Sequence, residues 1–136
     1  YIEVEQSDLN GFYAARFFSD LEIPPGMYQL TSAHFVIKDG HIGGVGDGGI
    51  LIVGIATIAV ENSVDVVITM DPTVANSDVL LFDGNGNSGR DPQTRSATLK
   101  ITVVDGRVEL RGNIKFGVAT ATVSARRVAG FKDAHV

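Results

Sequence analysis

Two Asp-Gly dipeptides, each set between stretches of alternating apolar and polar residues, constrain this chain most strongly. In residues 96–104 the apolar side chains fall on every second position, which is the period of a half-buried β-strand. Asp105-Gly106 follows, and this dipeptide tolerates the positive φ angles of a type I′ turn. A two-residue turn there places Ile101 opposite Leu110. The pattern therefore predicts a β-hairpin.

The second dipeptide, Asp39-Gly40, predicts another hairpin by the same argument. With the turn at these two residues, Ile37 lies opposite Ile42 on the neighbouring strand. Two independent hairpins indicate an antiparallel all-β chain.

A long apolar segment in the middle of the chain needs cover on both faces. Residues 49–58 are apolar at consecutive positions, and residues 64–70 continue the pattern after a turn. One face of this strand pair is expected to meet the protein interior, and the other a helix, a terminal segment or a second subunit. We take the second subunit as the favoured interpretation. The predicted partner or dimer interface consists of Ile50, Ile52, Glu61, Val66 and Ile68.

The N-terminal third is less sharply patterned. Residues 11–22 have apolar positions that suit a helix or a strand, and their aromatic content together with Gly11 favours the strand. The last strand is expected over residues 115–127. The whole chain then has about eight strands and no convincing long helix, which is typical of a meander closed into a barrel or folded into a sandwich.

We predict the barrel: a single, lipocalin-like, antiparallel up-and-down β-barrel of about eight strands. One domain is expected over residues 1–136, with residues 1–9 and 130–136 as terminal extensions.

Composition excludes several function classes. The chain has no cysteine, so a disulfide framework, a thiolate metal site and a cysteine nucleophile are all impossible. A net charge of −5 argues against nucleic acid as a partner. The longest uncharged apolar run, residues 48–60, is too short to span a bilayer, which takes about 20 residues. Lacking a secretory signal pattern as well, the chain is expected in the cytoplasm.

No motif in the sequence argues for catalysis, a metal or a cofactor. Glycines 44, 46 and 49 have the spacing of a dinucleotide fingerprint, but a β-branched run follows them instead of a helix. The three histidines lack the spacing of metal ligands. Arg126 and Arg127 are expected to cap the last strand at the surface. We therefore predict a non-enzymatic protein without cofactor or metal.

Aromatic residues concentrate in the first 35 positions. Packing in the core explains them most simply, and a wall that faces a ligand is the sharper alternative. The predicted ligand-binding residues of the barrel interior are Tyr13, Phe17, Tyr28 and Phe35.

Three segments resemble the GrlR-like family. Residues 10–17, Asn-Gly-Phe-Tyr-Ala-Ala-Arg-Phe, are similar to its opening Gly-x-Tyr-x-x-x-Phe strand. Residues 26–44, which end in Lys-Asp-Gly-His-Ile-Gly-Gly, are similar to its first hairpin, and residues 120–129 to its last strand. Three features depart from the family. The step after Gly43-Gly44 lacks the acidic residue that is typical there, Val53 stands where a tyrosine is typical before Gly54, and only Glu61 is acidic within residues 59–63.

The resemblance implies a lipocalin-like barrel that negatively regulates type III secretion through a protein partner. Two functions follow as hypotheses. The first is a regulatory module that acts through protein–protein interaction as a homodimer. The second is a lipocalin-like carrier that holds an apolar small molecule inside the barrel.

Overall fold

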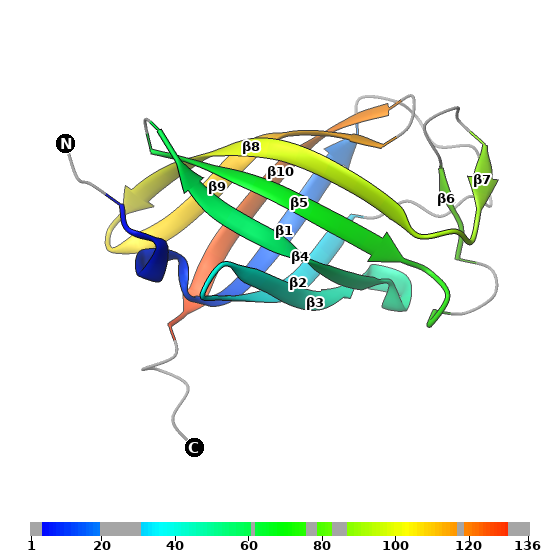
Figure 1. Ribbon diagram of the computed structural model, residues 1–136, viewed down its shortest axis with the longest axis horizontal. Helices are drawn as coiled ribbons and strands as arrows, with labels where there is room; N and C mark the ends of the chain where they lie inside the picture. The colour runs from blue at the N-terminus through cyan, green and yellow to red at the C-terminus, as the bar shows by residue number, and fades with distance from the viewer. Residues whose placement is uncertain are drawn as a thin grey trace, which may run out of the picture.

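Eight antiparallel strands close into one barrel in the computed structural model (Figure 1). The structure describes residues 4–19, 31–60, 62–75, 79–82, 87–116 and 119–130. Around the ring the strands follow the order β1, β10, β9, β8, β5, β4, β3 and β2, and β2 pairs back onto β1. The predicted all-β, single, antiparallel up-and-down barrel is confirmed, and the chain is not a sandwich.

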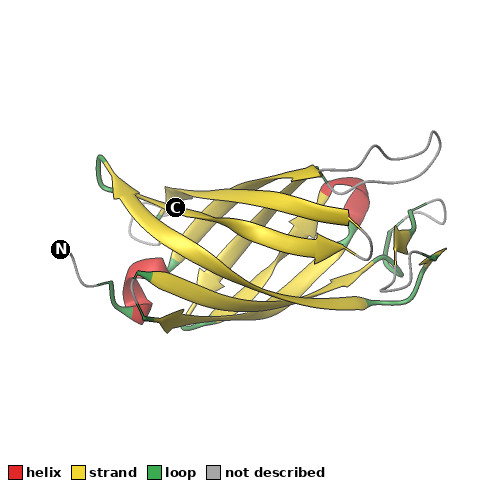
Figure 2. Cartoon of the chain, turned by 90° about the horizontal axis from the view of Figure 1, so that it is seen from above, coloured by secondary structure: helices red, strands yellow, loops and turns green. Residues whose placement is uncertain are grey.

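The strand and turn boundaries are as follows. The barrel strands are β1 (Gly11–Ser19), β2 (Ser32–Lys38), β3 (His41–Gly46), β4 (Leu51–Ala59), β5 (Ser63–Asp71), β8 (Gln93–Val104), β9 (Arg107–Phe116) and β10 (Ala119–Ala129). A separate small ribbon pairs β6 (Leu81–Phe82) with β7 (Ser88–Gly89). Two short 3-10 turns, η1 (Gln6–Leu9) and η2 (Asp47–Gly49), lie at opposite ends of the barrel (Figure 2).

Both predicted hairpins form with the predicted register. Ile37 pairs with Ile42 across the first turn, and Ile101 pairs with Leu110 across the second. The turn residues adopt positive φ at both positions, 50° and 83° at Asp39-Gly40 and 51° and 77° at Asp105-Gly106. Type I′ turns require this backbone conformation, which matches the right-handed twist of the flanking strands.

The N-terminal and C-terminal expectations are partly corrected. The described part of residues 11–22 is strand, as favoured. The predicted last strand is wrong at its start, because residues 115 and 116 end β9 and β10 begins at residue 119. Residues 6–9 are more than an extension, since they form η1 and bury Leu9 completely.

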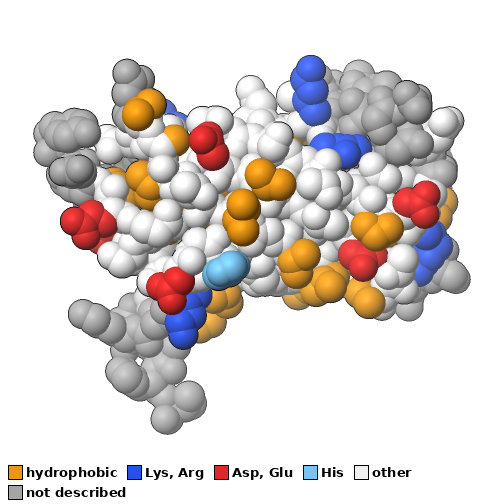
Figure 3. Space-filling view, in the orientation of Figure 1, with side chains coloured by type: hydrophobic (Ala, Val, Ile, Leu, Met, Phe, Trp, Pro, Cys, Tyr) orange, Lys and Arg blue, Asp and Glu red, His pale blue; other side chains and the backbone are white. Residues whose placement is uncertain are grey.

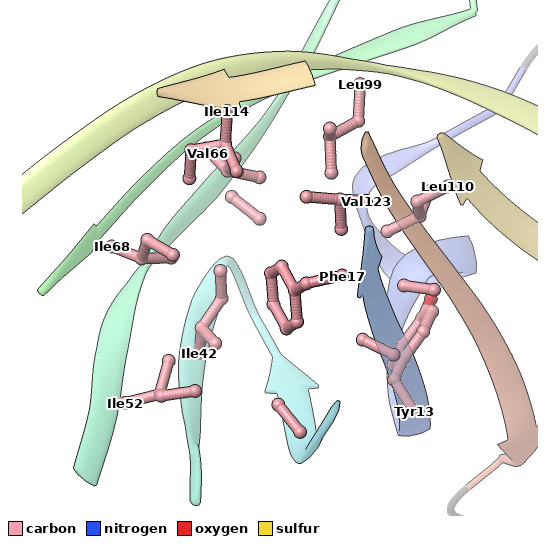
Figure 4. Packing of buried hydrophobic residues seen from close by; sticks show 14 of the residues in the cluster. Tyr13, Phe17, Ile42, Ile52, Val66, Ile68, Leu99, Leu110, Ile114 and Val123 are labelled. Carbon is pink, nitrogen blue, oxygen red and sulfur yellow. The ribbon is translucent and has the colours of Figure 1, made fainter. Parts of the chain in front are cut away.

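The core fills the inside of the barrel (Figure 4). Alternate residues of every long strand point inward, and no buried residue among those described is polar or charged. Phe17 lies near the middle of the packed side chains, which reach it from several strands. The largest fully buried side chain is Tyr13. The interior is therefore an apolar core of ordinary composition.

Two consecutive glycines in β3 have opposite surroundings. A Cβ atom at Gly44 would lie 2.2 Å from the carbonyl oxygen of His34 and 2.5 Å from the Cα of Phe35, on the neighbouring strand. At Gly43, no atom lies within 4 Å of an added Cβ. Gly44 therefore permits a close approach of two backbones where the sheet curves, whereas Gly43 faces open space.

We predict that Gly44→Ala destabilises the protein and that Gly43→Ala does not. The Gly44 variant must push apart β2 and β3, which costs about 1–3 kcal/mol, as overpacking typically does. The Gly43 variant should change the free energy of unfolding by less than about 0.5 kcal/mol, or raise it, because alanine restricts the unfolded chain. Urea unfolding of both variants at one protein concentration checks this. Equal losses in the two variants would show that the glycine in β3 matters for its backbone freedom and not for the contact with β2.

Candidate functional site

The aromatic residues predicted for the barrel interior do point inward. Tyr13 and Phe17 are 1% and 7% exposed, and Phe35 is half-buried and packs against the core. The Tyr13 and Phe35 rings stack in parallel, with centroids 5.3 Å apart. Tyr28 lies outside the described residues. The structure thus brings three of the four predicted residues together inside the barrel.

The interior leaves little room for a ligand. A cavity of about 50 Å³ lies beside Phe17 and Phe35, and every residue that lines it is apolar. Pockets that hold small organic molecules typically measure about 300–1,000 Å³. With these side chains in place, the cavity has space for only a few non-hydrogen atoms.

The η1 turn closes one end of the barrel. Leu9 is fully buried, and the carbonyl oxygen of Leu9 accepts a hydrogen bond from the Tyr13 hydroxyl at 2.7 Å. The Arg127 guanidinium donates to the Asp8 carbonyl oxygen at 2.8 Å. The Gln6 side chain donates to the Ala56 carbonyl oxygen at 2.9 Å, which ties η1 to β4.

The segment that follows β5 also contributes side chains to the core. Val79 and Leu81 are buried in the same cluster as Ile50 and Met70. The Arg90 guanidinium donates to the carbonyl oxygens of residues 73, 75 and 79, at 3.1–3.2 Å. Arg90 therefore links residues 73, 75 and 79 of the segment that follows β5.

Burial raises the pKa of the Tyr13 phenol from 10.0 to about 12, and the positive charge of Arg127 offsets part of this rise. The cause is the removal of the hydroxyl from water at the closed end of the barrel, where ionisation would place a negative charge in an apolar surrounding. At neutral pH the hydroxyl is protonated and serves as a hydrogen-bond donor to η1.

The outer face of β3, β4 and β5 carries an apolar patch, which we call the β3–β5 face. Five aliphatic side chains on it are 38–49% exposed. Figure 3 shows hydrophobic side chains scattered over the side of the molecule that carries these strands in Figure 1. Val45 lies opposite Leu51 and Ile55 opposite Val67. Val53, whose own cross-strand partners are Gly43 and Thr69, lies between Leu51 and Ile55 in the outward row of β4. The face consists of Val45, Leu51, Val53, Ile55 and Val67.

The prediction of which residues form the outer face of β4 and β5 is wrong, because it chose side chains of the opposite face. Four of them point into the barrel and are at most 9% exposed, namely Ile50, Ile52, Val66 and Ile68. Side chains alternate between the two faces of a strand, so the exposed apolar face is formed by their odd-numbered neighbours. Glu61, the fifth predicted residue, lies outside the described residues.

A depression on the outside of β1, β2, β9 and β10 was not predicted, and we call it the arginine depression. It encloses about 700 Å³ and is lined by Arg16, Arg111 and Arg126, with Phe18 at its edge. The neighbours Arg126 and Arg127 thus have different roles, because only Arg127 reaches the closed barrel end. The sequence could have indicated one part of this depression, because the alternation of the last strand places Arg126 on the outer face.

Metal-ligating side chains do not cluster among the described residues. No group of three or more histidine, aspartate and glutamate side chains among them is placed to hold a metal ion. The helical turns in this part of the chain are also too short to cross a membrane.

Comparisons with known proteins give no relative for this chain. No protein family model, no curated protein and no solved structure matches it. The GrlR-like resemblance therefore remains a prediction.

We predict that Tyr13→Phe removes a pH dependence of stability between about pH 10 and pH 12. In the wild type the unfolded chain loses the Tyr13 proton near pH 10.0, while the folded protein holds it to about 12. The stabilisation is complete below pH 10 and is lost as the pH rises through that window. Urea unfolding of both proteins across this range measures it.

At neutral pH, Tyr13→Phe should lower the free energy of unfolding by about 1–3 kcal/mol, because the Leu9 carbonyl oxygen loses its buried donor. The difference between the two proteins should shrink from pH 10 upward. A constant difference up to pH 12 would contradict a raised pKa for Tyr13.

Proposed function

We propose that this protein is a non-enzymatic binding module that acts through protein–protein contact, as a homodimer formed by the β3–β5 face. The single observation that supports this proposal is the set of five aliphatic side chains exposed side by side on that face. Single exposed apolar residues are ordinary on protein surfaces, but a contiguous patch marks a surface for interaction.

A second copy of the chain suits this face for a geometric reason. In a two-fold dimer the same patch lies on both sides of the contact, so an apolar patch meets an apolar patch. A two-fold axis through Val53 places that residue against its own copy in the second chain. The other aliphatic side chains of the face then pack around this central contact. Two sheet faces packed in this way lie about 10 Å apart, as in β-sandwiches.

The surroundings of the patch also suit a second copy. Thr57, Thr69, Thr94 and Ser96 hold outward positions beside it on β4, β5 and β8, and the charged Asp65 and Asp71 lie at its two ends on β5. Thr69 and Thr94 share a hydrogen bond between their hydroxyl groups at 2.8 Å. Two copies that meet on this face therefore bring no like charges together at its centre.

The regulatory part of the proposal rests on the resemblance to the GrlR-like family, whose members act on a protein partner. The cytoplasm as the place of action and the identity of that partner remain predictions. The carrier function is the less supported alternative, because the interior cavity measures only about 50 Å³.

The mass in solution tests the homodimer. Size-exclusion chromatography with light scattering should give twice the 14.4 kDa of one chain at micromolar concentration. Val53→Lys places a charge at the centre of the contact and should raise the dissociation constant at least tenfold, which corresponds to about 1.4 kcal/mol. Val53 is 43% exposed, so the monomer should keep its fold.

Val104→Lys is the matched control. Val104 is an outward-facing strand valine, 53% exposed, but it lies in β8, outside the β3–β5 face. The control should stay dimeric. A wild-type protein of 14.4 kDa at every concentration, or equal effects of the two lysine variants, would overturn the proposed contact.

A further inference from the structure

The arginine depression gathers cations from three strands that are distant in the sequence. Arg16 lies on β1, Arg111 on β9 and Arg126 on β10, and all three side chains line the hollow of about 700 Å³. This volume falls within the range of about 300–1,000 Å³ that small organic ligands occupy. The depression therefore has the size of a ligand site.

The strand register arranges the cations around a hydroxyl group. Arg16 and Arg111 are the cross-strand partners of Ser124 on either side, so the three residues form one row over β1, β10 and β9. Neighbouring strands are about 4.7–4.9 Å apart, which separates the two arginine backbones by about 10 Å. Arginine side chains are long enough to converge from that separation on one anion above the serine. Arg126 follows in the adjacent row, opposite Ala14.

The charge of the depression is only partly offset from within the protein, because three arginines and one carboxylate line it. The side chains of Arg16, Arg111 and Arg126 make no hydrogen bond or ion pair within the described part of the chain. Among the described residues that line the hollow, Glu109 is the only carboxylate, and it is the cross-strand partner of Arg126. Three permanent positive charges thus face a hollow in a chain of net charge −5. This arrangement attracts an anion to one place on an otherwise acidic protein.

Phe18 adds an apolar surface to the same hollow. It is 58% exposed and follows Arg16 by two positions, so both side chains point outward from β1. Two positions along a strand correspond to about 6.6 Å. An anionic group held at Arg16 therefore places an attached apolar body within reach of the Phe18 ring.

We propose that the arginine depression binds a small phosphate monoester. The phosphate oxygens accept hydrogen bonds from Arg16, Arg111 and the Ser124 hydroxyl, and the organic part of the ester lies on Phe18. A phosphate monoester fits better than a carboxylate, because it offers three terminal oxygens and close to two negative charges to several guanidinium groups. The site is separate from the β3–β5 face, so this inference is independent of the proposed homodimer.

Phenyl phosphate is the probe that tests both halves of the site. In titrations followed by backbone amide NMR, it should shift signals of β1, β9 and β10 around the depression. It should bind at least tenfold more tightly than inorganic phosphate, phenol or benzoate. Benzoate that binds as well as phenyl phosphate would overturn the assignment of a phosphate ligand.

Variants separate the roles of the residues. Arg16→Gln combined with Arg111→Gln should weaken phenyl phosphate binding at least tenfold. Phe18→Ala should reduce it to the level of inorganic phosphate and leave the affinity for inorganic phosphate unchanged. Arg107→Gln is the matched control, since Arg107 is an exposed arginine of β9 that does not line the depression.

Three results would overturn the proposal. The first is the absence of phenyl phosphate binding to a folded wild-type protein. The second is an equal loss of affinity in the Arg107 control, which would indicate a general ionic effect. The third is binding of a glutamate-rich peptide at these strands when phenyl phosphate does not bind, which would assign the depression to an acidic protein segment. Val53→Lys should leave phenyl phosphate binding unchanged, so a failed dimer prediction does not affect this test.

Discussion

The pairing of β1 with β10 is the constraint on which the rest of the structure depends. It joins the two ends of the chain and closes the sheet, so that every barrel strand has a neighbour on both sides. Closure removes the unpaired edges that an open sheet exposes. In the closed barrel, alternate side chains of each strand point into the interior or out toward solvent. The inward set packs into a core with space for only a small cavity, of about 50 Å³. Both candidate recognition surfaces of the described part of the protein lie on its outside.

Closure also sets the positions of the two outer surfaces relative to each other. The β3–β5 face centres on β4, and the arginine depression centres on β1 and β10. In the ring of eight strands, β4 and β10 are four strands apart, which places them on opposite sides of the barrel. A dimer formed through the β3–β5 face leaves the arginine depression open to solvent. The two surfaces differ in chemistry as well, since one is aliphatic and the other carries permanent charge. Both can be occupied at once.

The sequence predicts the barrel well because its signals are local. Asp39-Gly40 and Asp105-Gly106 specify turns, and the alternation around them specifies the register that the structure has. The prediction of the outward-facing residues of β4 and β5 is wrong because residues 49–58 are apolar at odd and even positions alike. The sequence pattern there does not indicate which side chains face inward. Asp65 indicates the correct orientation of β5, because a charged residue is expected to face outward. It does so in the structure, where it accepts a hydrogen bond from Thr98, and its neighbour Val66 therefore faces inward. The arginine depression could not be predicted, because Arg16 and Arg126 become neighbours only through the closure of the barrel.

In the proposed dimer, outward and not inward side chains of β4 and β5 make the contact with another molecule. Methyl NMR of the protein at decreasing concentration tests it most directly, because each methyl group reports its own surroundings. The signals of Val53, Ile55 and Val67 should shift or broaden as the dimer dissociates, while those of Ile52, Val66 and Ile68 inside the barrel stay in place. Equal changes in both sets would mean that dissociation alters the core, and unchanged signals in both sets would show that the β3–β5 face has no partner copy. Either result would contradict recognition through the outer face.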